Sequence, residues 1–200
     1  MKNYILIAKS TFNDGCDRAC ALKAIFDLME ATAPAALNCD DILRSALVLS
    51  VSSFDLFLHE IFRFEVSHRL TQKKEINSLR IPFNVLISSE HMQIDMIDEA
   101  IRKDNSYKSF VAPDKLAECL RIFVEAPWDR IAVSLGEQPS TVKSKLKSVV
   151  DLRNRIAHEA DVNPTYGGVE LWPIYSEDVD SSIIFLRDLG SAVAEVINEA

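Results

Sequence analysis

The chain has 200 residues, of which 48% are hydrophobic and 26% are charged, and its formal net charge is -8 at pH 7. This length fits a single domain, residues 1–200, and the composition excludes an intrinsically disordered chain. The negative charge argues against a protein that coats nucleic acid through a broad basic surface, although it is compatible with a small basic pocket.

The N-terminal sequence does not predict export. "MKNYILIAKS" has too short an apolar core for a signal peptide, and charged residues or His interrupt the longer apolar runs before they reach a bilayer-spanning length. The four cysteines lack the spacing of a disulfide framework or a zinc site: Cys16, Cys20, Cys39 and Cys119. We therefore expect a soluble, cytoplasmic protein with reduced, buried thiols.

Two long helices are predicted first in the chain. One begins near Asn13 or Asp14, which are good N-cap residues, and ends before Pro34, with apolar side chains at intervals of three and four. The next begins at Asp40–Asp41, whose charges suit a helix N-terminus. Because residues 46–64 are apolar almost all round, this second helix is predicted to lie at the centre of the fold.

Shorter elements follow the central helix. Residues 71–88 are predicted as a connection, with an irregular or extended piece at 81–87. Five further helices are predicted: from Ser88 or Ser89 to about Lys103, from Pro113, over 128–135 before Gly136, from a cap at Ser140 or Thr141, and after Ser176. Between the last two, "VNPTYGGVELWPI" predicts a short irregular or hairpin segment. The whole chain is predicted to form one mostly helical domain.

The stretch "DLRNRIAHEAD", residues 151–161, places polar groups in the otherwise apolar end of a helix. Asn154 and His158 are four residues apart and share a helix face. Arg153 and His158 are five apart, which separates them by roughly 140° around the axis and about 7.5 Å along it. One helix cannot clamp a small group between that Arg and His, but two such helices packed across a two-fold axis could.

A purely structural interpretation of this stretch is also open. Arg155 could pair with Asp151 and Glu159 at i±4, and Arg153 could extend to solvent. The local basic concentration leads directly into the same stretch: Lys143, Lys145, Lys147, Arg153 and Arg155. The three lysines taken alone favour an ordinary solvated helix face.

A second polar pair interrupts the central helix. Asp55 and His59 are four apart within "SVSSFDLFLHEIF", and a carboxylate in such surroundings needs a partner. In one interpretation, the two side chains bond to each other or line a solvated seam of the helix. Alternatively, Asp55 orients Arg153 or His158 from a neighbouring helix; Arg153 is the preferred partner, within the chain or across a dimer, and His59 is the second choice.

The segment "RNRIAH" resembles the signature of the HEPN domains, in which Arg and a polar residue precede a His on one helix. The ordered set "ALVLSVSSFDLFLHEI", "VVDLRNRIAHEADVNP", "GGVELWPI" and "EDV" is similar to the RiboL-PSP-HEPN branch over roughly residues 40–190. The resemblance implies an all-α, HEPN-like helical bundle that dimerises through the motif helices. Many members are metal-independent endoribonucleases of toxin–antitoxin, antiphage or RNA-processing systems, whereas others are inactive modules that bind RNA or protein.

The resemblance assigns expected roles to individual residues. Arg153, Asn154 and His158 are expected to be catalytic, because His can transfer protons near neutral pH and Arg presents a cationic fork to phosphate. Lys147 and Arg155 are expected to bind RNA. The expected partners are an RNA substrate, a second copy of the chain and an antitoxin or effector protein, without metal, cofactor or membrane.

Two further expectations accompany these roles. Asp55 and His59 are expected to orient the catalytic residues without contacting the substrate. Some toxin members carry a Tyr two residues after the His, where a partner nucleotidyltransferase adds a nucleotide. Here that position is Ala160, so regulation by that route is not expected.

Overall fold

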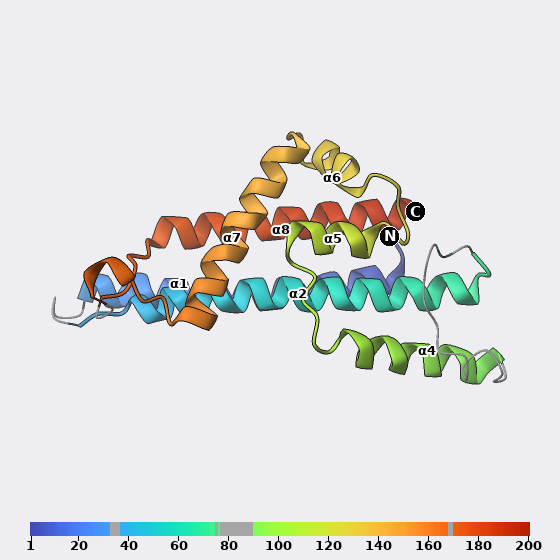
Figure 1. The fold of residues 1–200 in the computed structure, drawn as a ribbon, viewed down its shortest axis with the longest axis horizontal. Coiled ribbons are helices and arrows are strands. Elements are labelled where there is room, and N and C mark those ends of the chain that lie inside the picture. Colours follow the sequence, from blue (N-terminus) through green and yellow to red (C-terminus); the bar gives the residue numbers. More distant parts are fainter. Residues whose placement is uncertain (33–36, 75, 77–89, 168–169) are drawn as a thin grey trace.

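Three long helices form the body of the protein. The computed structural model describes residues 1–32, 37–74, 76, 90–167 and 170–200. Helices α1 (Asn3–Thr32), α2 (Asp40–Thr71) and α8 (Ser176–Glu199) lie along the longest axis of the molecule. Helix α1 runs antiparallel to α2 and α8, and the two chain termini lie at the same end (Figure 1). The predicted all-α fold is confirmed.

Helix α1 begins about ten residues earlier than predicted. Its buried positions continue toward the N-terminus at helical spacing: Ile5, Ala8, Phe12, Cys16 and Ala19. The apolar side chains of Leu6 and Ile7 lie between the first of these and are 50% and 54% exposed. They blur the alternation of apolar and polar faces, which is why Asn13 and Asp14 wrongly suggested a helix start.

An aromatic cluster joins the three long helices. The ring of Phe12 on α1 lies 5.7 Å from that of Phe54 and 5.1 Å from that of Phe57, both on α2. On the other side, a Cβ atom added at Gly190 of α8 would overlap the Phe12 ring. Gly15 of α1 similarly leaves no room for a Cβ beside Ser53 of α2. The two glycines therefore allow α1 to approach both of its neighbours closely.

Helix α2 is the central helix, as predicted. It packs against α1, α8, α4, α7 and α5, and Leu43, Leu47, Val51 and Phe54 are all inaccessible to solvent. By length and composition alone α2 could span a membrane, but half of its most apolar window is buried within the bundle. The core helix of a soluble protein has the same pattern.

In the described part of the chain, four shorter helices pack around this layer: α4 (Glu90–Asn105), α5 (Pro113–Leu120), α6 (Pro127–Leu135) and α7 (Pro139–Glu159). The predicted start of α5 at Pro113 and the predicted end of α6 before Gly136 agree with the structure. Gly136 adopts the left-handed conformation that is common after a helix. Helix α7, however, has Pro139 in its first turn and Gln138 at its N-cap, without a side-chain cap. The predicted caps Ser140 and Thr141 are therefore wrong. The predicted piece at 81–87 lies outside the described residues.

The four cysteines are free. Cys16 and Cys119 are buried as predicted, whereas Cys20 and Cys39 are partly exposed. Burial raises the pKa of the Cys16 thiol to about 11. This thiol is therefore protonated at neutral pH, as expected for a cysteine that packs in a core.

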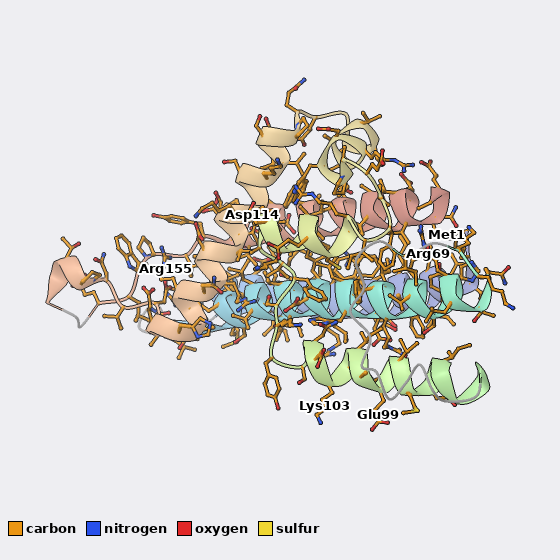
Figure 2. All side chains as sticks on the ribbon, turned by 45° about the vertical axis from the view of Figure 1, so that its right-hand side comes forward. Met1, Arg69, Glu99, Lys103, Asp114 and Arg155 are labelled. Carbon is orange, nitrogen blue, oxygen red and sulfur yellow. The ribbon has the colours of Figure 1, made fainter. Side chains whose placement is uncertain are left out.

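A buried polar cluster joins the N-terminus to the end of α2. The side chain of Glu65 is completely buried and accepts hydrogen bonds from the Tyr4 hydroxyl, from Lys2 Nζ at 3.1 Å and from Arg69 Nε at 2.7 Å. The backbone nitrogen of Lys2 also donates to Asn198 Oδ1 at 2.8 Å, near the C-terminus. Met1 and Arg69 lie at this end of the molecule in Figure 2.

We predict that this cluster makes the fold sensitive to acid. Burial alone would raise the pKa of Glu65, but its hydrogen bonds with Tyr4 and Arg69 and the nearby charge of Lys2 hold that pKa below the ordinary value of 4.5. A lowered folded-state pKa stabilises the fold above the unfolded-state pKa, and this stabilisation is lost as pH falls through the folded-state value. Urea unfolding of Glu65→Gln should therefore depend less on pH below about 4.5 than that of the wild type.

The matched control for this prediction is Glu118→Gln. Glu118 is an exposed carboxylate whose side chain is 59% accessible, so its removal should leave the acid profile of the protein nearly unchanged. A Glu65→Gln profile parallel to that of the wild type would contradict the assignment of the acid sensitivity to this cluster.

Candidate functional site

The motif helix α7 crosses the long helices steeply and ends near the loop that leads into α8 (Figure 1). Its first two-thirds bury one side of the helix: Val142, Leu146, Val149 and Val150. From Ala157 to Ala160, all side chains are exposed. The last turn of the motif helix is thus accessible to a ligand or to another chain.

Arg153 and His158 have different surroundings. Helical geometry places Arg153 on the same side as Leu146 and Val149, and its Nε atom is buried without a hydrogen-bond partner among the described residues. His158 is exposed, and Asn154 is partly buried. Arg153 and His158 thus differ in burial, and their separation by five residues places them on different sides of α7.

A buried ion-pair network holds the end of α7. The Asp161 carboxylate, which is inaccessible to solvent, accepts a hydrogen bond from Arg155 Nε at 2.5 Å and another from Arg44 Nε at 2.7 Å. Arg44 lies on α2, and its Nη2 also donates to the carbonyl oxygen of Trp172 at 2.7 Å. The guanidinium of Arg155 lies over the Trp172 ring, 5.2 Å from its centre.

Neither Arg44 nor Asp161 was identified from the sequence. The purely structural interpretation paired Arg155 with Asp151 and Glu159, which lie one helical turn away on either side. The actual partner of Arg155 is Asp161, which follows the end of α7. Asp151 instead pairs with Lys147 at 2.5 Å. The available signal was an arginine within the mainly apolar helix 40–64, because a buried guanidinium requires a carboxylate from elsewhere in the chain.

The segment between α7 and α8 folds back over this network. Asp161 N donates to the Arg155 carbonyl at 3.1 Å, and Trp172 N donates to the Asp161 carbonyl at 2.9 Å. A single antiparallel bridge joins Val162 to Leu171, and a 3-10 turn covers Pro164–Tyr166. The predicted irregular or hairpin segment is therefore an irregular one with one bridge.

The polar pair of α2 has a different partner from the one preferred on sequence grounds. Asp55 Oδ1 accepts a hydrogen bond from the backbone nitrogen of Phe110 at 2.8 Å. His59 Nε2 lies 3.2 Å from the carbonyl oxygen of Lys108 and 3.7 Å from Asp55 Oδ1, and its ring stacks on Phe110 at 4.3 Å. Within the chain, the expected pairing with Arg153 is wrong, and the second choice, His59, lies beside the carboxylate.

The physical reason lies in the segment between α4 and α5. Its backbone passes directly over α2, and an approaching segment carries amide and carbonyl groups that need partners. Asp55 and His59 supply an acceptor and a hydrogen-bonding ring nitrogen, respectively. Their role in the chain is to fix the connection before α5, and a contact between Asp55 and Arg153 of a second copy stays a prediction.

The lysines of α7 are engaged in local contacts. Lys145 pairs with Glu137 at 2.7 Å, and the ammonium of Lys143 lies 5.9 Å from the centre of the Trp128 ring. Lys147, expected to bind RNA, forms its exposed pair with Asp151 four residues later. These contacts favour the interpretation of the three lysines as a solvated helix face.

An open groove of about 550 Å³ runs between α2 and the end of α7. Its lining includes an apolar floor and a polar rim: Asp41, Arg44, Ser45, Val48, Leu49, Ser52, Ile156 and Ala160. The groove thus adjoins the side of α7 on which Arg153 lies. Among the described residues, no three His, Cys, Asp or Glu side chains gather as metal ligands would.

Comparison with known proteins agrees with this arrangement. The family model described as RiboL-PSP-HEPN matches residues 21–199, which include the motif helix, the Trp172 segment, all of α2 and α8 and the end of α1. No curated protein and no solved structure matches the chain. Because the match covers most of the sequence, the chain belongs to the RiboL-PSP-HEPN family.

Proposed function

We propose that the protein is a metal-independent endoribonuclease, active as a homodimer. The observation that carries this proposal is the Arg153, Asn154 and His158 motif at the accessible end of α7 in a chain of the HEPN family. The buried Nε of Arg153 has no hydrogen-bond partner among the described residues, and an unsatisfied buried donor is costly, so a rearrangement in the dimer that brings it an acceptor would be favoured. Two chains related by a two-fold axis bring an Arg and a His to one cleft.

Each residue has a distinct role in the proposed reaction. The 2′-hydroxyl of RNA attacks the adjacent phosphorus, and the 5′-oxygen of the next nucleotide leaves, which yields a 2′,3′-cyclic phosphate end. His158 takes the proton from the 2′-hydroxyl and gives it to the leaving 5′-oxygen, and Arg153 offsets the charge that develops on the phosphate oxygens. Asn154, one turn before His158, orients the imidazole or the phosphate. Lys147 and Arg155 contact neighbouring phosphates.

In the proposed dimer, Asp55 orients a catalytic residue of the other copy. Its carboxylate side chain is 19% exposed, and across a two-fold axis it orients Arg153 of the other copy, with His59 beside it. The protein acts in the cytoplasm, in toxin–antitoxin, antiphage or RNA-processing systems, where an antitoxin or effector protein controls it. These assignments rest on the family.

A second function, an inactive HEPN module that binds RNA or protein, is supported by specific observations. The lysines near the motif are engaged in local contacts, and the formal net charge is -8. Both features weaken the attraction for polyanionic RNA.

Incubation of the purified protein with total RNA in EDTA distinguishes the two functions. We expect cleavage products with 2′,3′-cyclic phosphate ends, detected by end-specific ligation, and a dimer in sedimentation measurements. A folded dimer that cleaves no RNA in this assay, with or without added divalent cations, would contradict the nuclease and favour the binding module.

A further inference from the structure

The Asp161 carboxylate connects two helices that are far apart in the sequence. Its side chain is completely buried, and it binds Arg44 of α2 and Arg155 of α7 at 2.7 and 2.5 Å. Arg44 is itself nearly inaccessible, with 7% of its side chain exposed. A carboxylate removed from water is costly unless cations and hydrogen bonds surround it. We call Arg44, Asp161 and Arg155 the α7 latch.

The latch coincides with a sharp reversal of the backbone. Ala160 and Asp161 both have positive φ angles, 50° and 55°, directly after the last residue of α7. Such conformations are unfavourable for residues other than glycine, especially for two in succession, and persist where surrounding contacts hold them. Here three groups of Asp161 hold the reversal. Its carboxylate accepts a hydrogen bond from Arg155 Nε, its backbone amide donates to the Arg155 carbonyl, and its own carbonyl accepts from the Trp172 amide.

The latch adjoins the motif directly. Arg155 lies in sequence between Arg153 and His158, and Asp161 follows His158 by three residues. Fixing both Arg155 and Asp161 against α2 therefore fixes the last turn of α7, which carries His158. Figure 2 shows Arg155 on the part of α7 near this loop, away from the end of the molecule that carries Met1 and Arg69.

We propose that Asp161 is a positioning residue for His158, an inference that rests on the proposed nuclease function. It acts through Arg155 and Arg44 and does not touch the substrate, because its carboxylate is completely buried. The latch keeps the imidazole at the distance and angle that proton transfer requires. A displacement of about 1 Å in such a group can lower the rate by about 100-fold.

Asp161→Asn tests the latch with little change in size. The amide keeps one acceptor oxygen but places an NH₂ group against the second guanidinium. We expect kcat for RNA cleavage to fall by about 10- to 100-fold, whereas KM changes by less than about threefold, because positioning affects the chemical step and not RNA binding. The matched control is Asp151→Asn, which removes an exposed carboxylate from the same helix and should leave kcat unchanged.

A second measurement separates the latch from the proposed reaction. Backbone amide exchange of Asp161 and Trp172, followed by NMR, should be faster in Asp161→Asn than in the wild type and unchanged in Asp151→Asn. If the wild type cleaves no RNA, the nuclease proposal fails, and amide exchange still tests whether the latch exists. Unchanged exchange, or faster exchange with an unchanged kcat, would overturn the positioning role.

Arg155→Lys provides the same test if Asp161→Asn does not fold. The lysine keeps a positive charge beside Asp161 but lacks the planar fork that fixes the angle. We expect a lower kcat, an RNA affinity within about threefold of that of the wild type and a folded far-UV circular dichroism spectrum. Because the lysine keeps the positive charge that the proposed phosphate contact of Arg155 uses, a loss of RNA affinity without a loss of kcat would overturn the place of Arg155 in the latch.

Discussion

Replacement of His158 with alanine is expected to lower the rate of RNA cleavage by about 10²- to 10⁴-fold, the usual contribution of a general acid or base. The imidazole is exposed on the last turn of α7 and packs in no part of the core. Its removal should therefore leave the free energy of unfolding within about 0.5 kcal/mol of the wild-type value. Single-turnover cleavage of a labelled RNA and urea unfolding of the same sample measure the two effects.

The control is Glu159→Ala, which truncates the exposed neighbour of His158 and should retain wild-type cleavage. Arg153→Ala should lose activity to a similar extent, because the reaction then lacks the cation on the phosphate. Wild-type activity in either Arg153→Ala or His158→Ala would remove that residue from the proposed site.

Mixing the two inactive variants tests whether one site uses both chains. A mixed dimer contains one intact Arg153 and one intact His158, on different chains. If the cleft is shared across the two-fold axis, activity should reappear when subunits exchange. A mixture that forms mixed dimers, shown by differently tagged chains, but remains inactive would contradict the shared cleft.

Phe12→Ala is expected to cost about 3–5 kcal/mol of stability, the largest effect predicted for a core side chain here. Phe12 is 2% exposed and contacts two aromatic rings of α2. It also fills the space that Gly190 leaves on α8. The alanine leaves a cavity where three helices meet, and neighbouring rings cannot close it without disturbing their own packing. Urea or thermal unfolding measures the loss.

Leu28→Ala is the matched control for this substitution, because Leu28 lies on the same helix but is 62% exposed. Its unfolding free energy should change by no more than about 0.5 kcal/mol. If both variants lost the same amount of stability, the effect would come from the helix itself and not from the aromatic cluster.

The features that the sequence predicted well are those set by neighbouring residues. Apolar residues on almost all sides identified α2 as the central helix, Pro113 located the start of α5, and Gly136 located the end of α6. The start of α1 was missed because Leu6 and Ile7 hide its periodic face. The motif itself lies on a helix, as its spacing predicted.

Contacts between distant residues were not predictable in the same way. The pairing of Arg44 with Asp161 spans 117 positions, and Asp55 binds the backbone of a segment 55 residues away. The sequence shows that a buried arginine or carboxylate needs a partner, but many residues satisfy that need equally well. The choice depends on how the helices pack, and no local pattern encodes it.

The place of α8 has a consequence for the synthesis of the protein on the ribosome. Helix α8 (Ser176–Glu199) packs against both α1 and α2, yet residues 72–175 separate it from α2 in the chain. A nascent chain can pair α1 with α2 early, but the apolar surface that receives α8 stays exposed until residues 176–199 have been synthesised. Exposed apolar surface of this kind attracts chaperones and other nascent chains. Until α8 is in place, the protein is therefore an incomplete bundle that is vulnerable to aggregation.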